Sequence, residues 1–164
     1  MSDLKKLTLL HSNDMHGDFT AQQVDDRLLG GVSMLSGYIQ QVRKEEENVL
    51  YTVSGDMFQG SVIDSEYRGL STVEIMNLLT PDVVTLGNHT WNRREICSCL
   101  DDTPQLLRPA NFAPQLPGTG VGIYDTDYGP IAVVNLVGRC GMDFNADNPF
   151  TKIDGILKKL EGMP

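Results

Sequence analysis

Three short turns, each directly after an apolar run, constrain this chain more than any other feature. The apolar runs are Lys6–Leu10, Val49–Val53 and Asp82–Leu86. The turns after them carry residue types that bind metals and handle phosphate: Asp14, His16, Asp56, Asn88 and His89. Strand-like runs that alternate with helical spacing predict a layered α/β domain with a largely parallel sheet. Because ligands bind beyond the carboxyl ends of such strands, we expect these side chains to gather on one rim.

The remaining elements follow from periodicity and from turn residues. The first half predicts a loop over Gly17–Gly31, helices over Val32–Glu46 and Leu70–Leu79, and a helix over Asn92–Leu100. Ser71, with Glu74 three residues later, predicts an N-cap for the second of these helices. The second half predicts a strand over Leu106–Asn111, a hairpin of Val121–Thr126 with Pro130–Val137, and a closing helix over Ile153–Leu160.

Length and charge limit the class of protein. A chain of 164 residues suits one domain, so we expect residues 1–164 to form a single unit. A net charge of −9 argues against a partner that is a nucleic-acid polymer, since binding one needs a basic surface. No run is long enough for a membrane span, and the odd count of three cysteines suits reduced thiols. We therefore expect a cytoplasmic protein that does not bind membranes.

The three turns together predict a two-metal site for phosphate-ester hydrolysis. Asp14 and His16, two residues apart, could bind one cation, while Asp56 could bridge two cations and Asn88 could bind the second. Mixed nitrogen and oxygen ligands suit Mn, Zn, Fe, Co or Ni, with Mg as a further candidate. Two such cations can hold a phosphate and stabilise a leaving oxygen. His89 could protonate the leaving group or stabilise the phosphoryl charge.

Each motif also has a structural interpretation. An isolated Asp-x-His or Gly-Asp is usually part of an ordinary turn, and an isolated Asn often caps a helix. His11 is expected to be a structural histidine at the end of a strand. Arg108 and Asn111 are weaker candidates for substrate binding, with a structural role as the equal alternative. The order of the three turns, more than any single residue, favours function.

The residues of the turns also resemble a known superfamily. The blocks are His11–Gly17, Ser54–Ser61 and Leu86–His89, and they are similar to those of calcineurin-like metallophosphoesterases. Residues 4–89 resemble bacterial 5′-nucleotidases, whereas residues 82–164 resemble the YmdB-like group of cyclic-nucleotide phosphodiesterases. The change of branch near residues 81–89 indicates either a chimera or a divergent natural intermediate. The resemblance implies a truncated metallophosphoesterase sandwich with a mixed sheet and a C-terminal hairpin.

The resemblance assigns roles and also reveals two departures. It implies that Asp14 and His16 hold the first metal, Asp56 bridges, Asn88 holds the second metal and His89 is catalytic. The family usually has Asp three residues after this histidine, where the chain has Asn92, which would stabilise an imidazolium less. The family also uses later histidines as ligands, and none follows His89 here. The site could therefore hold two divalent cations or only one.

Two functions follow from these patterns. The first is a divalent-metal-dependent hydrolase that acts on nucleotides, either 5′-monoesters or cyclic diesters. The alternative is a catalytically weak or inactive scaffold that binds only metal or phosphate. A truncated copy of the fold would leave apolar surface exposed, so a homo-oligomer is a further expectation.

Overall fold

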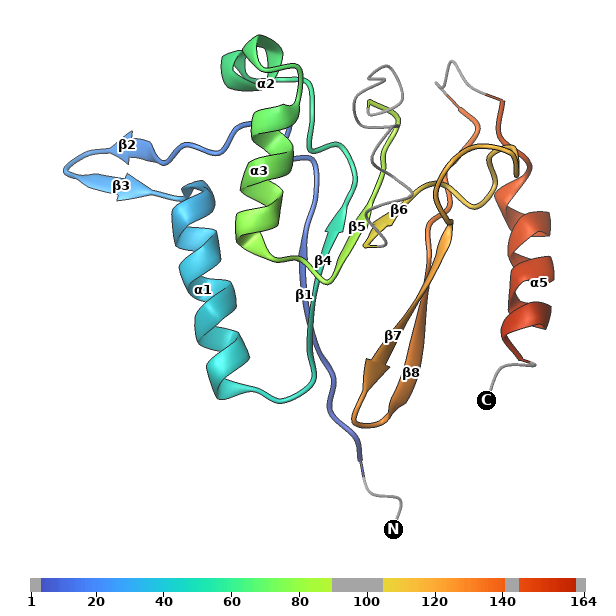
Figure 1. The fold of residues 1–164 in the computed structure, drawn as a ribbon. Coiled ribbons are helices and arrows are strands. Elements are labelled where there is room, and N and C mark those ends of the chain that lie inside the picture. The colour runs from blue at the N-terminus through green and yellow to red at the C-terminus, as the bar shows by residue number, and fades with distance from the viewer. Residues whose placement is uncertain (1–3, 90–104, 141–144, 162–164) are drawn as a thin grey trace.

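A parallel sheet of four strands forms the centre of the molecule. The computed structural model describes residues 4–89, 105–140 and 145–161. The strands are β1 (Thr8–Ser12), β4 (Val49–Ser54), β5 (Val83–Thr85) and β6 (Leu106–Leu107), in the order β1-β4-β5-β6. All three pairings are parallel, so the carboxyl ends of the strands lie along the same edge of the sheet, at the top of Figure 1. The α/β class and the parallel N-terminal sheet are thereby confirmed.

Two helices cover one face of this sheet. They are α1 (Gly31–Glu45) and α3 (Leu70–Leu79), which lie side by side on the left in Figure 1. Ile39 of α1 and Leu79 of α3 are almost fully buried against Tyr51 and Val53 of β4. Burial of an aliphatic side chain of this size contributes roughly 1.5–3 kcal/mol. This core therefore fixes the helices on the sheet and, with them, the loops that follow the strands.

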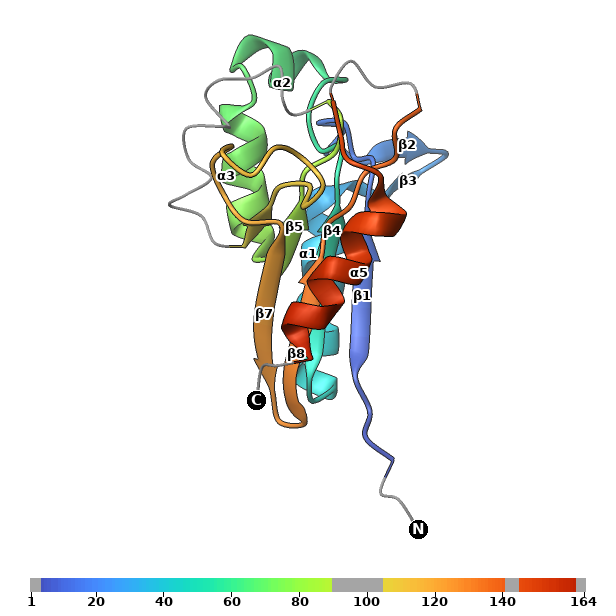
Figure 2. The same cartoon turned by 90° about the vertical axis from the view of Figure 1, so that its right-hand side faces the viewer.

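An antiparallel hairpin covers the other face. It consists of β7 (Val121–Thr126) and β8 (Gly129–Val134), as predicted, and α5 (Pro149–Leu160) lies outside it in Figure 2. The buried Asn135 ties the end of β8 to the sheet, because its amide donates to the carbonyls of Leu86 and Leu107, at 3.3 and 2.7 Å. At the other end of the hairpin, Asn48 pairs with Asp127. These hydrogen bonds hold hairpin and sheet together at both ends.

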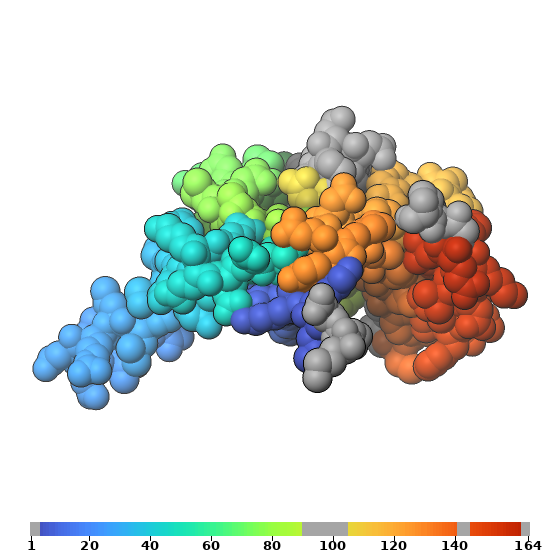
Figure 3. Space-filling model, turned by 90° about the horizontal axis from the view of Figure 1, so that it is seen from below, coloured from blue at the N-terminus to red at the C-terminus, as the bar shows by residue number. Residues whose placement is uncertain are grey.

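The predicted loop over Gly17–Gly31 was wrong, because it contains a second hairpin. Strands β2 (Gln22–Val24) and β3 (Arg27–Leu29) pair around Asp25-Asp26, and Asp25 has a φ of 52°. All six strand residues are exposed, so neither face produces the alternation of apolar and polar residues that identifies a strand in a sequence. The arm of these strands projects from the body of the molecule (Figure 3).

Other boundaries differ in smaller ways. The bounds of α3 match the prediction, but the predicted N-cap was wrong, since Gly69 in a left-handed conformation is the N-cap and the Ser71 hydroxyl donates to the carbonyl of Ile63. A short helix, α2 (Val62–Glu66), was not predicted; Ser61 caps it by accepting from the Asp64 amide at 3.0 Å. Strand β6 ends before Pro109, which has no amide hydrogen for a ladder. The helix predicted over Asn92–Leu100 lies outside the described residues.

No helix in the described part of the chain has both the length and the apolar composition that a membrane crossing requires.

Candidate metal centre

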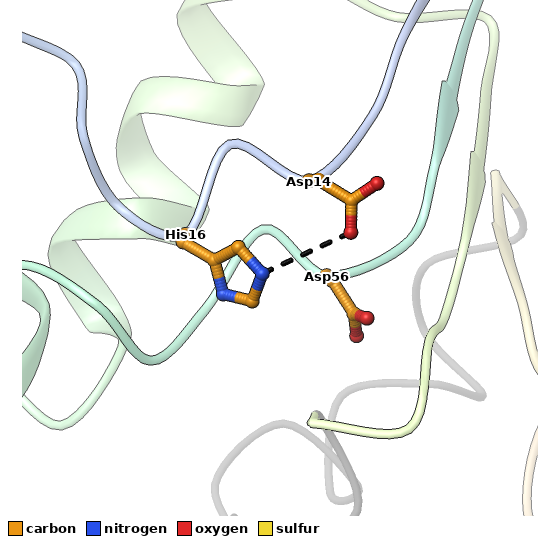
Figure 4. A group of neighbouring side chains, drawn as sticks. All are labelled: Asp14, His16 and Asp56. Atoms are coloured by element: carbon orange, nitrogen blue, oxygen red, sulfur yellow. Dashed lines mark ion pairs between the residues drawn. The ribbon is translucent and has the colours of Figure 1, made fainter.

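Three ligand-type side chains from the first two turns converge beyond the ends of β1 and β4. Asp14, His16 and Asp56 each offer one ligand atom, and these atoms all lie within 4.8 Å of one another. Figure 4 shows the Asp14 carboxylate facing the His16 ring, with 3.8 Å between Oδ1 and Nε2, and Asp56 beside them. Asp14 is exposed, whereas His16 and Asp56 are partly buried. The sequence therefore predicted the residues of this cluster and its place at the sheet edge.

The two loops that carry these residues are joined by main-chain hydrogen bonds. The Asp14 amide donates to the carbonyl of Gly55 at 3.2 Å, and the His16 amide donates to the carbonyl of Asp56 at 3.0 Å. The backbones of all three ligand-type residues are left-handed, with φ of 50° for Asp14, 48° for His16 and 46° for Asp56. Such conformations cost on the order of 1 kcal/mol each and concentrate at functional sites. The surrounding hydrogen bonds hold this strained arrangement in place.

The orientation of the His16 ring suits a metal ligand. Its Nδ1 lies 3.0 Å from the carbonyl oxygen of Phe58 and 2.9 Å from that of Gln59. Carbonyl oxygens only accept, so Nδ1 must carry the hydrogen, and in the neutral ring Nε2 keeps its lone pair on the side of Asp14. A histidine whose second nitrogen is fixed in this way is typical of metal sites. Two carboxylates and one imidazole fit a divalent cation.

The third turn, which carries Gly87, Asn88 and His89, packs against the second turn at Asp56. The His89 amide donates to Asp56 Oδ1 at 3.2 Å, and the His89 ring lies edge-on to the His16 ring, with 5.4 Å between centroids. At Gly87, a Cβ would lie 2.7 Å from Asp56 Cγ and 2.8 Å from the Asp56 amide nitrogen, so the close approach requires glycine. Asn88 lies in this turn between Gly87 and His89, partly buried. Its role as the second metal ligand stays a prediction.

A residue that the sequence reasoning missed contacts both site histidines. Gln59 Oε1 lies 3.1 Å from His89 Nδ1, and the carbonyl oxygen of Gln59 is one of the two that accept from His16. The sequence signal was weak: Gln59 stands three residues after Asp56 in a glycine-bounded loop, with no charge to mark it.

The weaker candidates lie elsewhere. Arg108 is almost fully buried, and its guanidinium donates to the carbonyls of Gly118 and Pro109. Asn111 is fully buried. Its side-chain NH₂ group donates to the carbonyls of Val137 and Asp147, and its Oδ1 accepts from the Val137 main-chain N–H. These contacts favour the structural alternative for both, and substrate contact by either stays a prediction. Asn92 lies outside the described residues.

Comparison with known proteins decides the family. A family model described as "YmdB-like protein" matches residues 29–163. The chain belongs to the YmdB-like family. The matched range includes residues 81–89, so the proposed change of branch there stays a prediction without support from this match.

Relatives carry both activities that the sequence suggested. The chain is 42% identical over 76 residues to 2′,3′-cyclic-nucleotide 2′-phosphodiesterase of Bacillus subtilis, covering 46% of this chain and 28% of that protein. It is 40% identical over 95 residues to mouse 5′-nucleotidase, covering 53% of this chain and 16% of that protein. The expected resemblance to both groups is confirmed. The YmdB-like chain spans under a third of these relatives.

Solved structures agree on the fold. The 5′-nucleotidase precursor of Thermus thermophilus superposes with a TM-score of 0.78 at 20% identity, over 94% of this chain and 34% of that one. The NAD nucleotidase of Haemophilus influenzae gives 0.76 at 19% identity, over 94% of this chain and 32% of that one. At these identities the likeness shows a shared fold, and the layered α/β fold predicted from the sequence is confirmed.

Proposed function

We propose that this YmdB-like protein is a divalent-metal-dependent phosphoester hydrolase that acts on nucleotides. The observation that carries the proposal is the cluster of Asp14, His16 and Asp56 beyond two parallel strands, with the His89 ring beside it. Carboxylates and an imidazole at such a position suit Mn, Zn, Fe or Co, with Mg as a further candidate. The cluster accounts for one cation, and Asn88 would have to complete a second.

The chain's own residues have distinct roles in this proposal. Asp14 and His16 would hold a cation and Asp56 would bridge to a second one. A cation bound there supplies Lewis-acid stabilisation of the phosphoryl charge. His89, whose main-chain amide already bonds to Asp56, would hold a proton near the leaving oxygen and transfer it as a water oxygen bonds to phosphorus, releasing its proton to solvent, and the ester bond breaks. The main-chain hydrogen bonds between the two loops would keep these groups in place before substrate arrives.

The names of the relatives support two substrate types. The mouse relative is a 5′-nucleotidase and the Bacillus relative is a 2′,3′-cyclic-nucleotide 2′-phosphodiesterase. Both reactions cleave a phosphorus–oxygen bond in a nucleotide, so one site chemistry serves either. A cytoplasmic location belongs to the same proposal and is supported by the cysteine pattern of the sequence.

The test combines metal analysis with activity. The full chain is analysed for bound metal, then assayed with a nucleoside 5′-monophosphate, a 2′,3′-cyclic nucleotide and an aryl phosphate, with and without Mn²⁺. We expect metal-dependent hydrolysis that falls at least ~100-fold in Asp56→Asn, which keeps the side-chain shape but removes the charge. The exposed Asp154→Asn on α5 is the control and should keep full activity. Equal activity without metal would contradict the proposal.

A second candidate rests on the histidine count. The chain has only three histidines, at 11, 16 and 89, whereas the resemblance implies later histidine ligands. It would then bind one cation and turn over weakly or not at all. Calorimetric titration with Mn²⁺ separates the two candidates: two tight sites per chain support the hydrolase, and one weak site with no turnover supports the inactive scaffold.

A further inference from the structure

Gln59 makes a two-point contact with the proposed catalytic histidine. Its Nε2 donates to the main-chain carbonyl of His89 at 2.6 Å, while its Oε1 lies 3.1 Å from His89 Nδ1. One amide group therefore contacts both the backbone and the ring of the same residue. Rotation of the His89 ring would break the contact with Gln59 Oε1, and displacement of the turn would break the contact with Gln59 Nε2.

The two contacts together determine which ring nitrogen carries the hydrogen. The carbonyl oxygen of His89 only accepts, so the Gln59 atom facing it must be the NH₂ group. The atom facing the ring is then Oε1, which also only accepts, so His89 Nδ1 must donate. Neutral His89 is thereby held with its hydrogen on Nδ1 and a free lone pair on Nε2. The same acceptor serves the imidazolium, in which both nitrogens carry hydrogen.

Gln59 is itself held from the protein interior. The backbone of Gln59 is left-handed, with a φ of 64°, and its main-chain N–H donates to Asp64 Oδ2 at 2.8 Å. Asp64 is 1% exposed, and its other oxygen accepts from the Thr72 hydroxyl of α3 at 2.8 Å. The position of Gln59 is thus set by a buried carboxylate that is anchored to a core helix.

The same residue reaches the other histidine through its main chain. The Gln59 carbonyl oxygen lies 2.9 Å from His16 Nδ1, and the two histidine rings are 5.4 Å apart. The side chain of Gln59 therefore holds His89 while its backbone holds His16. A change of the side chain alone should affect one histidine and spare the other.

We propose that Gln59 is the positioning residue of this site. It fixes His89 in the Nδ1–H tautomer and sets its distance from the metal ligand His16. The catalytic part of this inference rests on the proposed function, whereas the tautomer does not. A neutral amide here supplies an acceptor for the ring, as a carboxylate would, without adding a negative charge next to the metal ligands.

The direct test measures tautomers in the metal-free full chain by long-range ¹⁵N–¹H correlation at alkaline pH. The chain has only three histidines, so His89→Asn and His16→Asn assign the spectrum. We expect Nδ1–H for His16 and His89 in the unmodified protein. In Gln59→Leu, His89 should lose this form while His16 keeps it. Gln59→Asn should behave like Gln59→Leu, because Asn tolerates the left-handed backbone but is one methylene too short.

Exposed Gln22→Leu on β2 is the matched control and should leave both rings unchanged. A His89 that keeps the Nδ1–H form in Gln59→Leu, or that has the Nε2–H form in the unmodified protein, would overturn the proposal.

Kinetics supply the second readout. Gln59→Leu should lower kcat by about 10–100-fold, the usual effect of losing a residue that orients a ligand or catalytic group, with KM and Mn²⁺ affinity nearly unchanged. Gln59→Glu retains an acceptor for Nδ1 but has no donor for the His89 carbonyl and adds a negative charge, so it should keep His89 in the Nδ1–H form and restore only part of kcat. An unchanged kcat, or a loss of Mn²⁺ binding as large as that of kcat, would overturn the positioning role. An inactive unmodified protein would overturn the proposed function, while the tautomer measurement would still decide the role of Gln59.

Discussion

At the scale of residues, the candidate metal centre depends on backbone conformations that most side chains avoid. Asp14, His16 and Asp56 all have positive φ, and Gly87 lies so close to Asp56 that a Cβ would overlap it. Asp and His are among the residues that tolerate the left-handed region best. The turns therefore combine residue types that bind metals with residue types that allow the chain to bend sharply after a strand.

Gly87→Ala should weaken metal binding. The added methyl group would lie 2.7 Å from Asp56 Cγ, so the carboxylate or its backbone must move. We expect Mn²⁺ affinity to fall by about 10–100-fold in calorimetric titration, the range found when a metal ligand loses its orientation. Gly37→Ala is the control, since a Cβ there meets nothing within 4 Å in α1, and it should stabilise the helix by about 0.5–1 kcal/mol. Equal Mn²⁺ affinity in both variants would refute this explanation of Gly87.

At the scale of elements, β1 and β4 are joined by side chains as well as by their ladder. Tyr51 of β4 is 1% exposed, and its hydroxyl lies 2.8 Å from the Ser12 hydroxyl at the end of β1. This hydrogen bond lies just before the two turns that carry Asp14 and Asp56. The same pair of strands therefore builds the core and positions the ligand-type residues of the candidate metal centre.

The stability of these elements should depend on alkaline pH. Burial raises the pKa of Tyr51, against smaller opposing effects of the Ser12 hydrogen bond and the Arg43 charge; burial and then Asp82 raise the pKa of Tyr124. Both phenols therefore ionise less readily in the folded protein than in the unfolded chain, where the pKa is about 10. The stability linked to them is complete below about pH 10 and is lost as pH rises further.

Urea unfolding across this range measures the effect. Tyr51→Phe should flatten the fall in unfolding free energy above about pH 10, because one titrating group is gone. The same variant should lose about 1 kcal/mol at neutral pH through the missing Ser12 hydrogen bond. A fall as steep as that of the unmodified protein would show that Tyr51 ionises equally in both states.

At the scale of the whole molecule, apolar side chains are exposed on the projecting arm and on the helix beneath it. Leu28 and Leu29 of β3 are 66% and 49% exposed, and Met34 and Tyr38 of α1 are 65% and 58% exposed. A hollow of about 530 Å³ at the base of the arm is lined partly by Phe19, Leu35 and Tyr38. Surfaces of this kind favour association.

We expect the protein to self-associate as concentration rises, through this arm. Light scattering after size exclusion should show a mass that increases with concentration, and Leu28→Lys should shift the mass toward the monomer. Leu78→Lys is the matched control, since Leu78 is 78% exposed on α3 and does not line the hollow at the base of the arm. A monomeric mass at every concentration would contradict the expectation, and an equal effect of both variants would exclude the arm as the interface.

The sequence predicted the central elements because their patterns are local. The apolar runs of β1, β4 and β5 and the spacing of α1 and α3 follow from burial on a sheet face or a helix face. The arm of β2 and β3 was missed because its residues are all exposed and have no buried face to mark them. The N-cap was wrongly assigned to Ser71. Gly69, in a left-handed conformation, precedes α3, and no side-chain hydroxyl caps the helix.

The sequence by itself determined which ligand-type residues gather at the candidate metal centre, because residues at the carboxyl ends of parallel strands share one edge of the sheet. Only the tertiary structure decided how that site is held. The pairing of the Asp14 and Asp56 loops, the approach of Gly87 and the contacts of Gln59 with His16 and His89 join segments far apart in the chain. A neutral amide has no pattern in sequence that reveals such a role, since its hydrogen bonds depend on which groups the fold brings within about 3 Å of it.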